Sequence, residues 1–219
     1  MPVSHANCTI IIDPAPRTGA NNMRIDEQHL EAVDRGDSPP IVRIYTWESP
    51  TVSLGYFQKS VPVPGRFSEC EVVRRLTGGG AILHDREITY SIALPPRNRF
   101  RSAPIEAYDS VHNAIISLLN SLGVSCEMRM HSEAEHMPAA KDEFLCFLRA
   151  DPRDVVAGPC KIVGSAQRRR KGSILQHGSI LMRHSSLTPE MPGIEDLFEE
   201  IDLNSFKNQL GEAIARAVT

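Results

Sequence analysis

Short hydrophobic runs separated by turn residues fill the first hundred positions of the chain. They are rich in Val, Ile, Thr and Tyr, the residue types that favour β-strands. The runs predicted as strands are residues 9–12, 41–47, 51–54, 72–75, 81–83 and 88–94. Between the first two runs, the apolar spacing in 21–33 predicts a short helix.

The clearest helical pattern covers residues 103–122. Its apolar residues recur at steps of three and four, which places them on one face of a helix. They are Ile105, Tyr108, Val111, Ile115, Leu118, Leu119 and Leu122. Ser102 is predicted as the N-cap, and Gly123 suits the position that follows the last turn.

The second half of the chain returns to strands and then ends in helices. Strands are predicted at 125–130, 144–148, 155–156, 161–163 and 174–182, and helices at 194–200 and 203–218. Polar residues predict long connections at 98–103 and 131–142. This order of elements predicts an α+β fold in which helices pack against a mixed or antiparallel sheet.

Composition supports a folded, soluble chain. Its 219 residues are 41% hydrophobic and 23% charged, which suits one large domain or two small ones. No run approaches the roughly 20 apolar residues of a membrane span, and no secretory signal is expected at the N-terminus. The net charge of −3 gives no reason to expect a nucleic-acid partner.

The five cysteines, at positions 8, 70, 126, 146 and 160, contain no Cys-x-x-Cys pair. This spacing predicts neither a disulfide framework nor a zinc site. We therefore expect reduced thiols, no bound metal and a cytoplasmic location.

The first segment that suggests chemistry reads RRLTGGGAILHD over residues 74–85. Three consecutive glycines weaken a strand, but they allow the backbone to approach a ligand and to bind an anion or a carbonyl oxygen through its N–H groups. Arg74 and Arg75 add donors for an anion. The alternative is a flexible hairpin turn, with His84 and Asp85 as ordinary turn residues.

Three further segments allow both a structural and a functional interpretation. In KIVGSAQR, residues 161–168, the small residues leave room for a ligand, and Lys161 is either a fixed charge or a solvated strand end. His177, before Gly178, suits a structural histidine or an acid–base group. Cys146, within FLCFL, suits a buried inert thiol or a nucleophile. The basic run 168–171 predicts a solvated hairpin tip.

Together and in this order, these segments resemble the lipoate/biotin protein ligase superfamily, and within it the lipoate-protein ligase A-like proteins. The resemblance spans residues 9–185 and depends on RRxTGGGAxxHD, KxxGSAQ and HGS occurring together. It implies an α+β fold with a large mixed sheet and a single catalytic domain over residues 1–219, without a C-terminal accessory domain.

The resemblance also implies an activity. This family transfers octanoyl or lipoyl chains to a lysine on lipoyl domains of 2-oxoacid dehydrogenases or on the glycine cleavage H protein. The glycine-rich segment lines the acyl pocket, and the matching lysine, Lys161, contacts the acyl carbonyl. The substrate-binding residues implied are Arg75, Thr77, Gly78, Gly79, Gly80, His84, Gly164, Ser165, Ala166, Gln167, Arg168, His177 and Gly178.

Two branches of the family differ in how they activate the acyl group. Ligases use ATP and Mg²⁺, and in them the positions matching Arg75, Thr77 and Arg168 hold the acyl-adenylate. Cysteine-type octanoyltransferases take octanoate from the phosphopantetheine thioester of acyl carrier protein and require no cofactor. Cys146-Phe147, placed before Lys161, favours the transferase, with Cys146 as nucleophile.

Three alternatives stay open from the sequence. They are an ATP-dependent lipoate-protein ligase, an amidotransferase that moves acyl groups between carrier proteins, and an acyl-binding module without catalysis. Cys160 is a second thiol beside Lys161 and competes for the role of nucleophile. The basic run 168–171 suits docking of an acidic carrier domain.

Overall fold

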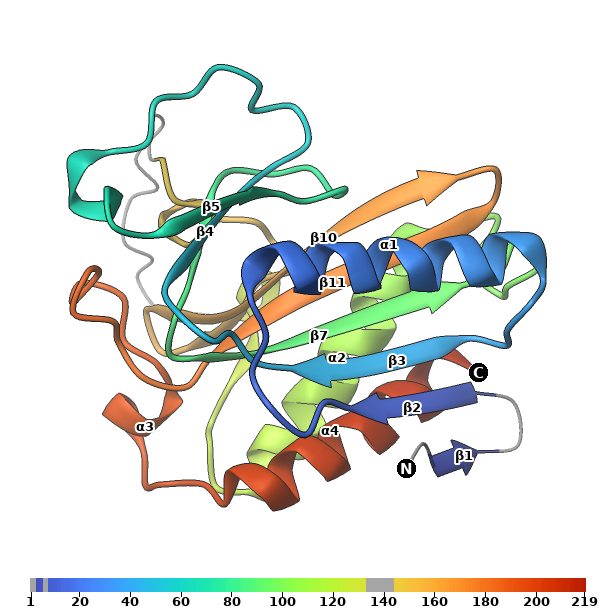
Figure 1. Cartoon of the computed structure of the whole chain (residues 1–219). Coiled ribbons are helices and arrows are strands. Elements are labelled where there is room, and N and C mark those ends of the chain that lie inside the picture. Colours follow the sequence, from blue (N-terminus) through green and yellow to red (C-terminus); the bar gives the residue numbers. More distant parts are fainter. Residues whose placement is uncertain (1–2, 6–7, 133–143) are drawn as a thin grey trace.

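The computed structural model describes residues 3–5, 8–132 and 144–219, and its largest feature is an eight-stranded sheet (Figure 1). In order across the sheet, the strands are β1 (Val3–His5), β2 (Cys8–Ile12), β3 (Ile41–Tyr45), β7 (Glu87–Leu94), β11 (Ser173–Leu181), β10 (Cys160–Arg170), β9 (Val155–Ala157) and β8 (Glu127–Met128). β2 and β3 are parallel and the other neighbours are antiparallel. The predicted mixed α+β architecture is confirmed.

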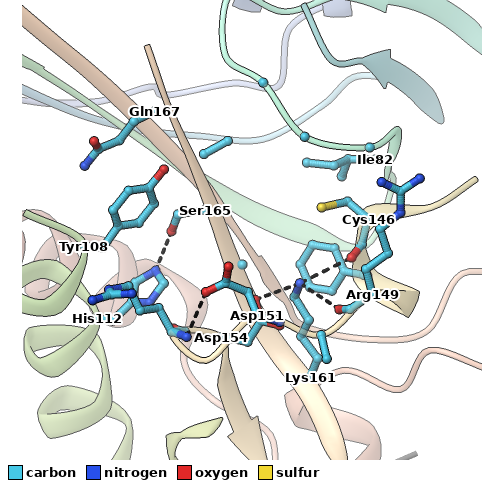
Figure 2. A pocket seen from close by; sticks show the side chains of 18 of the residues that line it. Ile82, Tyr108, His112, Cys146, Arg149, Asp151, Asp154, Lys161, Ser165 and Gln167 are labelled. Atoms are coloured by element: carbon cyan, nitrogen blue, oxygen red, sulfur yellow. Dashed lines mark hydrogen bonds and ion pairs between the residues drawn. The ribbon is translucent and has the colours of Figure 1, made fainter. Parts of the chain in front are cut away.

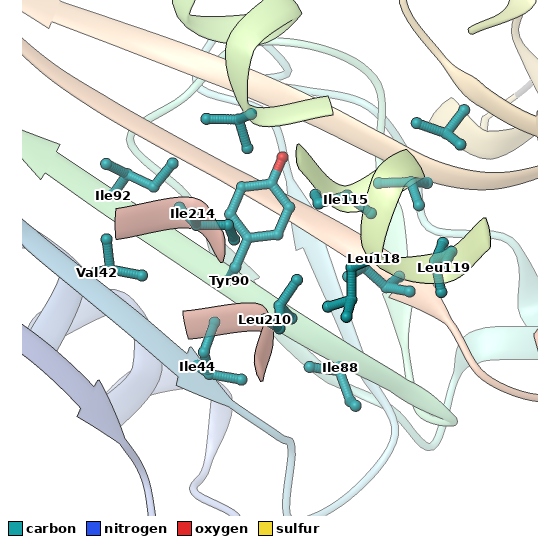
Figure 3. Close-up of a cluster of buried hydrophobic side chains, with 14 of the residues drawn as sticks. Val42, Ile44, Ile88, Tyr90, Ile92, Ile115, Leu118, Leu119, Leu210 and Ile214 are labelled. Carbon is teal, nitrogen blue, oxygen red and sulfur yellow. The ribbon is translucent and has the colours of Figure 1, made fainter. Parts of the chain in front are cut away.

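Helices cover both faces of this sheet. α1 (Gly19–Arg35) lies on one face, and α2 (Ile105–Ser121) and α4 (Leu203–Val218) lie together on the other (Figure 1). Successive side chains of β7 point to opposite faces. Ile88, Tyr90 and Ile92 therefore enter the core under α2 and α4, where they meet Ile115, Leu118, Leu119, Leu210 and Ile214 (Figure 3).

A smaller sheet carries the glycine-rich segment. It consists of β5 (Glu71–Arg74), β4 (Thr51–Leu54) and β6 (Ile82–His84). A second hydrophobic core fixes the segment around residue 146 against this sheet, because Leu145 and Phe147 pack there with Val52, Phe67 and Leu83. The remaining short helices are η1 (Gly65–Phe67), η2 (Arg129–His131), η3 (Cys146–Leu148) and α3 (Ile194–Leu197).

Two local predictions are wrong. Residues 144–148 do not form a strand: Leu145 makes one isolated bridge to Ala81, and the chain then turns into η3. Ser102 does not cap α2, which starts after Pro104 without a side-chain cap. Most of the predicted connection 131–142 lies outside the described residues. Within the described residues, no helix combines the length and the apolar character that a membrane crossing needs.

Candidate active site

A cavity of about 400 Å³ lies between β10, the start of α2, the glycine-rich segment and the turn around residue 146 (Figure 2). It brings together most of the residues singled out from the sequence, although they come from segments far apart in the chain. Those that line it are Arg75, Gly78, Gly79, Gly80, Cys146, Lys161, Gly164, Ser165, Ala166 and Gln167. Their roles stay predictions.

Backbone pairing positions Cys146 next to the glycines. Its N–H donates to the Ala81 carbonyl oxygen at 2.7 Å, and its sulfur points into the cavity (Figure 2). Gly79 has a φ of +92°, and a Cβ built on it would lie 3.7 Å from the Cys146 sulfur and 3.1 Å from Nη2 of Arg75. A glycine here therefore serves both the backbone conformation and the close approach of two functional groups.

A β-bulge positions Lys161. The register of β10 against β9 shifts between Lys161 and Val163, so Lys161 shares a sheet face with Gly164, three positions later. A Cβ on Gly164 would lie 2.7 Å from Cε of Lys161. The small residue expected to leave room for a ligand thus also leaves room for the lysine side chain.

The ammonium group of Lys161 is held from several sides. It forms a 2.8 Å ion pair with Asp154, and both side chains are buried. It also donates to the carbonyl oxygens of Cys146 at 3.3 Å and Arg149 at 3.5 Å. Burial raises the pKa of Asp154, although the charge of Lys161 opposes this. Lys161 therefore ties the Cys146 turn to β10.

The opposite wall of the cavity carries a chain of neutral hydrogen bonds (Figure 2). His112 Nδ1 lies 2.6 Å from the Arg153 carbonyl oxygen, which only accepts, so this nitrogen carries the proton. Nε2 then accepts from the Ser165 hydroxyl, which is also bonded to the Tyr90 hydroxyl. Burial lowers the pKa of His112 to about 4, so the imidazole is neutral at physiological pH.

Gly178 makes this arrangement possible, although it does not line the cavity. A Cβ on Gly178 would lie 2.6 Å from the Tyr90 ring and 2.7 Å from the Ser165 hydroxyl oxygen. The substrate binding expected of Gly178 stays a prediction, and the described close contacts of this position are with Tyr90 and Ser165.

Thr77 and His177 belong to a separate buried network beneath α1. The Thr77 hydroxyl and Nε2 of His177 are 2.6 Å apart, and Nδ1 of the same imidazole lies 3.7 Å from Asp26. Asp26 accepts hydrogen bonds from Arg43, Tyr45 and Ser91. Burial lowers the pKa of His177, against the influence of Asp26. The structural interpretation of His177 accounts for every contact described.

The remaining predicted binding residues also lie away from the cavity lining. His84 is held between Ser53 and Glu87, at 2.7 Å from each, and stacks on Trp47 with ring centroids 3.8 Å apart. Arg168 lies over the ring of Tyr56 at 4.3 Å. These contacts give both side chains local roles in packing.

The second thiol, Cys160, occupies a different environment from Cys146. It starts β10 at the residue before Lys161 and is not part of the cavity lining. Burial raises the pKa of its thiol, which disfavours the reactive thiolate. Geometry thus favours Cys146 over Cys160 as the candidate nucleophile.

Sequence reasoning missed Asp154 and His112, both of which line the cavity. The sequence signal at Asp154 is an acidic residue directly before an apolar strand. His112 sits beside Val111 in the apolar stripe of α2, where a histidine needs a buried partner. The described residues contain no cluster of three or more His, Cys, Asp or Glu side chains suited to a metal ion.

The mixed sheet, the glycine-rich wall and the lysine of β10 define a class of protein. The chain matches the family model "Lipoyl protein ligase A/B catalytic domain" over residues 18–215, and it belongs to that family. The resemblance found in the sequence is confirmed.

Within the family, the chain is similar to proteins named octanoyltransferase LipM. It is 37% identical to that of Oceanobacillus iheyensis over 194 residues, covering 86% of this chain and 67% of the relative. It is 39% identical to that of Brevibacillus brevis over 174 residues, covering 74% and 62%. The chain thus spans roughly two thirds of the length of these relatives.

Solved structures agree on the fold. A lipoate-protein ligase A bound with ATP superposes with a TM-score of 0.66 at 21% identity, covering 94% of this chain and 84% of the other. LipL1 of P. falciparum in complex with lipoate gives 0.67 at 15% identity, covering 96% and 62%. At these sequence identities, the comparison establishes the fold and does not identify the reaction.

Proposed function

We propose that this protein is an octanoyltransferase of protein lipoylation that works through a thioester on Cys146. The proposal is supported by relatives of that name at 36–39% identity. The observation that carries the covalent route is the Cys146 sulfur, which points into the cavity against Gly79 and shares that cavity with Lys161. That residues 1–219 form one catalytic domain stays a prediction.

In the first half-reaction, the Cys146 thiolate attacks the carbonyl carbon of an octanoyl thioester. The donor is the phosphopantetheine thioester of acyl carrier protein. A new sulfur–carbon bond forms on Cys146, the donor sulfur leaves as a thiolate, and it takes up a proton from solvent. Because one thioester replaces another, no nucleotide is consumed.

In the second half-reaction, a neutral lysine amine of a lipoyl domain attacks the acyl-enzyme. An amide bond forms, the bond to the Cys146 sulfur breaks, and the amine nitrogen releases one proton to solvent. Each attack places negative charge on the former carbonyl oxygen. The cationic Lys161 faces the same cavity, and a donor at such an oxyanion contributes roughly 3–4 kcal/mol.

The partners follow from these two half-reactions. The donor is acyl carrier protein, and the acceptors are lipoyl domains of 2-oxoacid dehydrogenases or the glycine cleavage H protein. Arg169, Arg170 and Lys171 are exposed at the β10–β11 hairpin. A basic tip suits acidic carrier domains and would raise their association rate at low salt.

Intact-mass measurement tests the covalent step. We expect wild type incubated with octanoyl-acyl carrier protein to gain one octanoyl group, and the matched variant Cys160→Ala to gain it equally. Cys146→Ala should gain none and should transfer none to a lipoyl domain. An octanoyl adduct that persists on Cys146→Ala would remove this residue from the nucleophile role.

Two alternative activities are separated by the choice of donor. An ATP-dependent ligase predicts lipoate-dependent pyrophosphate exchange, which the proposed enzyme lacks. An amidotransferase predicts transfer from an octanoylated lipoyl domain or H protein to a second lipoyl domain, with acyl carrier protein absent. The reactions are distinguished by testing three donors under one set of conditions: octanoyl-acyl carrier protein, lipoate with ATP, and an octanoylated lipoyl domain or H protein.

A further inference from the structure

Phe57 is 78% exposed, the highest value for a large hydrophobic side chain in the described part of the protein. It lies in the long connection that leaves β4 and extends beyond the small sheet (Figure 1). Its ring contacts the glycine-rich segment, because a Cβ built on Gly78 would lie 3.9 Å from two ring carbons. Gly78 lines the cavity. An exposed aromatic ring next to a candidate active site is typical of a surface that binds another protein.

Hydrogen bonds fix the loop that carries Phe57. The N–H of Gly55 donates to the side-chain oxygen of Gln58 at 2.9 Å, and the N–H of Gln58 donates to the carbonyl oxygen of Gly55 at 2.9 Å. Arg74 donates to the carbonyl oxygens of the same two residues, at 3.1 Å and 2.9 Å. The ring is therefore held in solvent before a partner binds, which lowers the entropic cost of using it as a contact.

Positively charged side chains surround the exposed ring. Tyr56 lies edge-on to Phe57, with ring centroids 5.1 Å apart, and the guanidinium of Arg168 lies 4.3 Å above the Tyr56 ring. Lys59 and Arg74 are exposed on the same loop and on the neighbouring strand. We call these five residues the aromatic–basic surface. Among the described residues, no carboxylate lies within 4 Å of its three cations.

The other charged groups of the cavity belong to its opposite wall. The carboxylates of Asp151 and Asp154 come from the segment before β9, and Arg149 and Arg153 line the same side. Arg153 is paired there with Asp109 at 2.8 Å. That wall therefore mixes both signs of charge.

The segments on the glycine side carry one sign only. They contain Lys and Arg but no Asp or Glu, although acidic residues outnumber basic ones in the whole chain by 27 to 24. These segments are residues 55–68, 72–84 and 161–173. A positive surface on a chain of net negative charge favours an acidic partner and raises its association rate.

The position of the aromatic–basic surface indicates which substrate docks there. Phe57 contacts Gly78, and the Cβ position of the next residue, Gly79, lies 3.7 Å from the Cys146 sulfur. A domain bound to Phe57 is thus already beside the candidate nucleophile. A lysine amine extends only four methylene groups from its backbone, whereas a phosphopantetheine arm is much longer. The short reach of lysine requires such close docking, and the long arm of the donor does not.

We propose that the aromatic–basic surface docks the acceptor of the reaction, an acidic protein domain that presents a lysine. Phe57 is the apolar anchor of this interface, and Lys59 and Arg74 pair with carboxylates of the partner. The inference rests on the proposed function for the identity of the acceptor as a lipoyl domain.

Binding tests the proposal without any acyl transfer. The probe is a fluorescently labelled, unmodified lipoyl domain, titrated with the protein and followed by fluorescence anisotropy. We expect Phe57→Ala to raise Kd at least about tenfold, and Phe57→Tyr to keep most of the affinity. Lys59→Gln should raise Kd a few-fold at low salt and have no effect at about 1 M salt. The control Leu203→Ala, which truncates an exposed apolar side chain on α4, should bind like wild type.

Small substrates separate docking from damage to the glycine-rich segment. Octanoyl-pantetheine serves as a donor without a carrier protein, and hydroxylamine serves as a small acceptor that releases the octanoyl group from the enzyme. Phe57→Ala should keep the wild-type rates with both. Its transfer to the lipoyl domain should fall at least about tenfold, through KM. An equal loss with the small substrates would assign Phe57 a structural role and overturn the proposal.

The remaining outcomes are distinct. Absence of binding by wild type, or equal Kd values for wild type and Phe57→Ala, would overturn the proposal. So would an effect of Phe57→Ala on acyl carrier protein alone, or a wild-type dimer that this substitution dissociates in sedimentation. If the lipoyl domain binds through Phe57 but receives no octanoyl group, the proposed function fails and the docking surface stands. If it receives the group equally well from Phe57→Ala, the reverse holds.

Discussion

At the scale of single residues, absent side chains shape this site as much as present ones. The missing side chain at Gly79 leaves room for Arg75 and Cys146 to approach the same point. The missing side chain at Gly164 leaves room for the side chain of Lys161. The sequence signals that drew attention to both segments were runs of small residues. Their interpretation as space for a ligand is incomplete, because protein groups occupy part of that space.

Gly164→Ala tests this account. Its new methyl group would lie 2.7 Å from Cε and 3.2 Å from Nζ of Lys161, so the end of the lysine side chain must shift from its position beside Asp154. We expect kcat/KM for the proposed octanoyl transfer to fall roughly 100-fold, because the group proposed to stabilise the oxyanion would lose its orientation. Octanoylation kinetics followed by mass spectrometry provide the measurement.

A matched glycine serves as the control for that substitution. Gly65 has nothing within 4 Å of its Cβ position and a φ outside the left-handed region. Gly65→Ala should leave activity unchanged and the free energy of unfolding within about 0.5 kcal/mol of wild type. Full activity in Gly164→Ala would show that the position of Lys161 is unimportant.

At the scale of elements, the hydrophobic pattern of the sequence correctly predicted helices and strands whose positions are determined by burial of apolar side chains. The helix predicted at 203–218 is α4, with the same bounds, and the strand predicted at 51–54 is β4. The turn at Cys146 was predicted as a strand because FLCFL is continuously apolar. Its burial comes from packing in the second core, which a hydrophobic run alone cannot distinguish from a strand.

Features that depend on contacts between different elements could not be predicted from the sequence. The β10 bulge, which places Lys161 and Gly164 on one face, depends on pairing with β9. The Lys161–Asp154 pair likewise joins β10 to the residue that precedes β9. The sequence thus identified both cavity walls through the glycines and KIVGSAQR, but not the acidic partner or the histidine of α2.

Helix caps provide a test at this scale. Asp202 is the N-cap of α4, and its carboxylate accepts from the N–H groups of Asn204 at 3.0 Å and Ser205 at 3.3 Å. Asp202→Ala should lower the free energy of unfolding by about 1 kcal/mol, measured by urea denaturation. The control is Glu212→Ala, which removes an exposed 3.6 Å pair with Arg216 and should change stability by less than about 0.5 kcal/mol. Equal losses of stability in Asp202→Ala and Glu212→Ala would show that the Asp202 cap does not stabilise α4.

At the scale of the whole molecule, neutral buried histidines couple folding to pH. His112 and His177 lie on opposite sides of the main sheet, and burial lowers the pKa of both. The unfolded chain takes up these protons near pH 6.5, whereas folded His112 does so only near pH 4. Acid therefore favours the unfolded chain.

The pH dependence of unfolding tests this coupling. With a folded pKa of about 4 and an unfolded value near 6.5, His112 alone should reduce the free energy of unfolding by about 3 kcal/mol as pH falls from 7 to 4. Asp154, whose pKa burial raises, acts in the opposite direction, so the comparison is made between variants. Urea denaturation at half-unit pH intervals supplies the free energies.

The informative variant is His112→Asn, whose amide can still donate to the Arg153 carbonyl oxygen but does not titrate. It should be less stable than wild type at pH 7, because the Ser165 hydroxyl loses its acceptor. Its stability should nevertheless fall less steeply toward pH 5, so that the two curves converge. The exposed His131→Asn should keep the wild-type slope. Parallel curves for wild type and His112→Asn would mean that His112 takes up its proton in the folded protein as readily as in the unfolded chain.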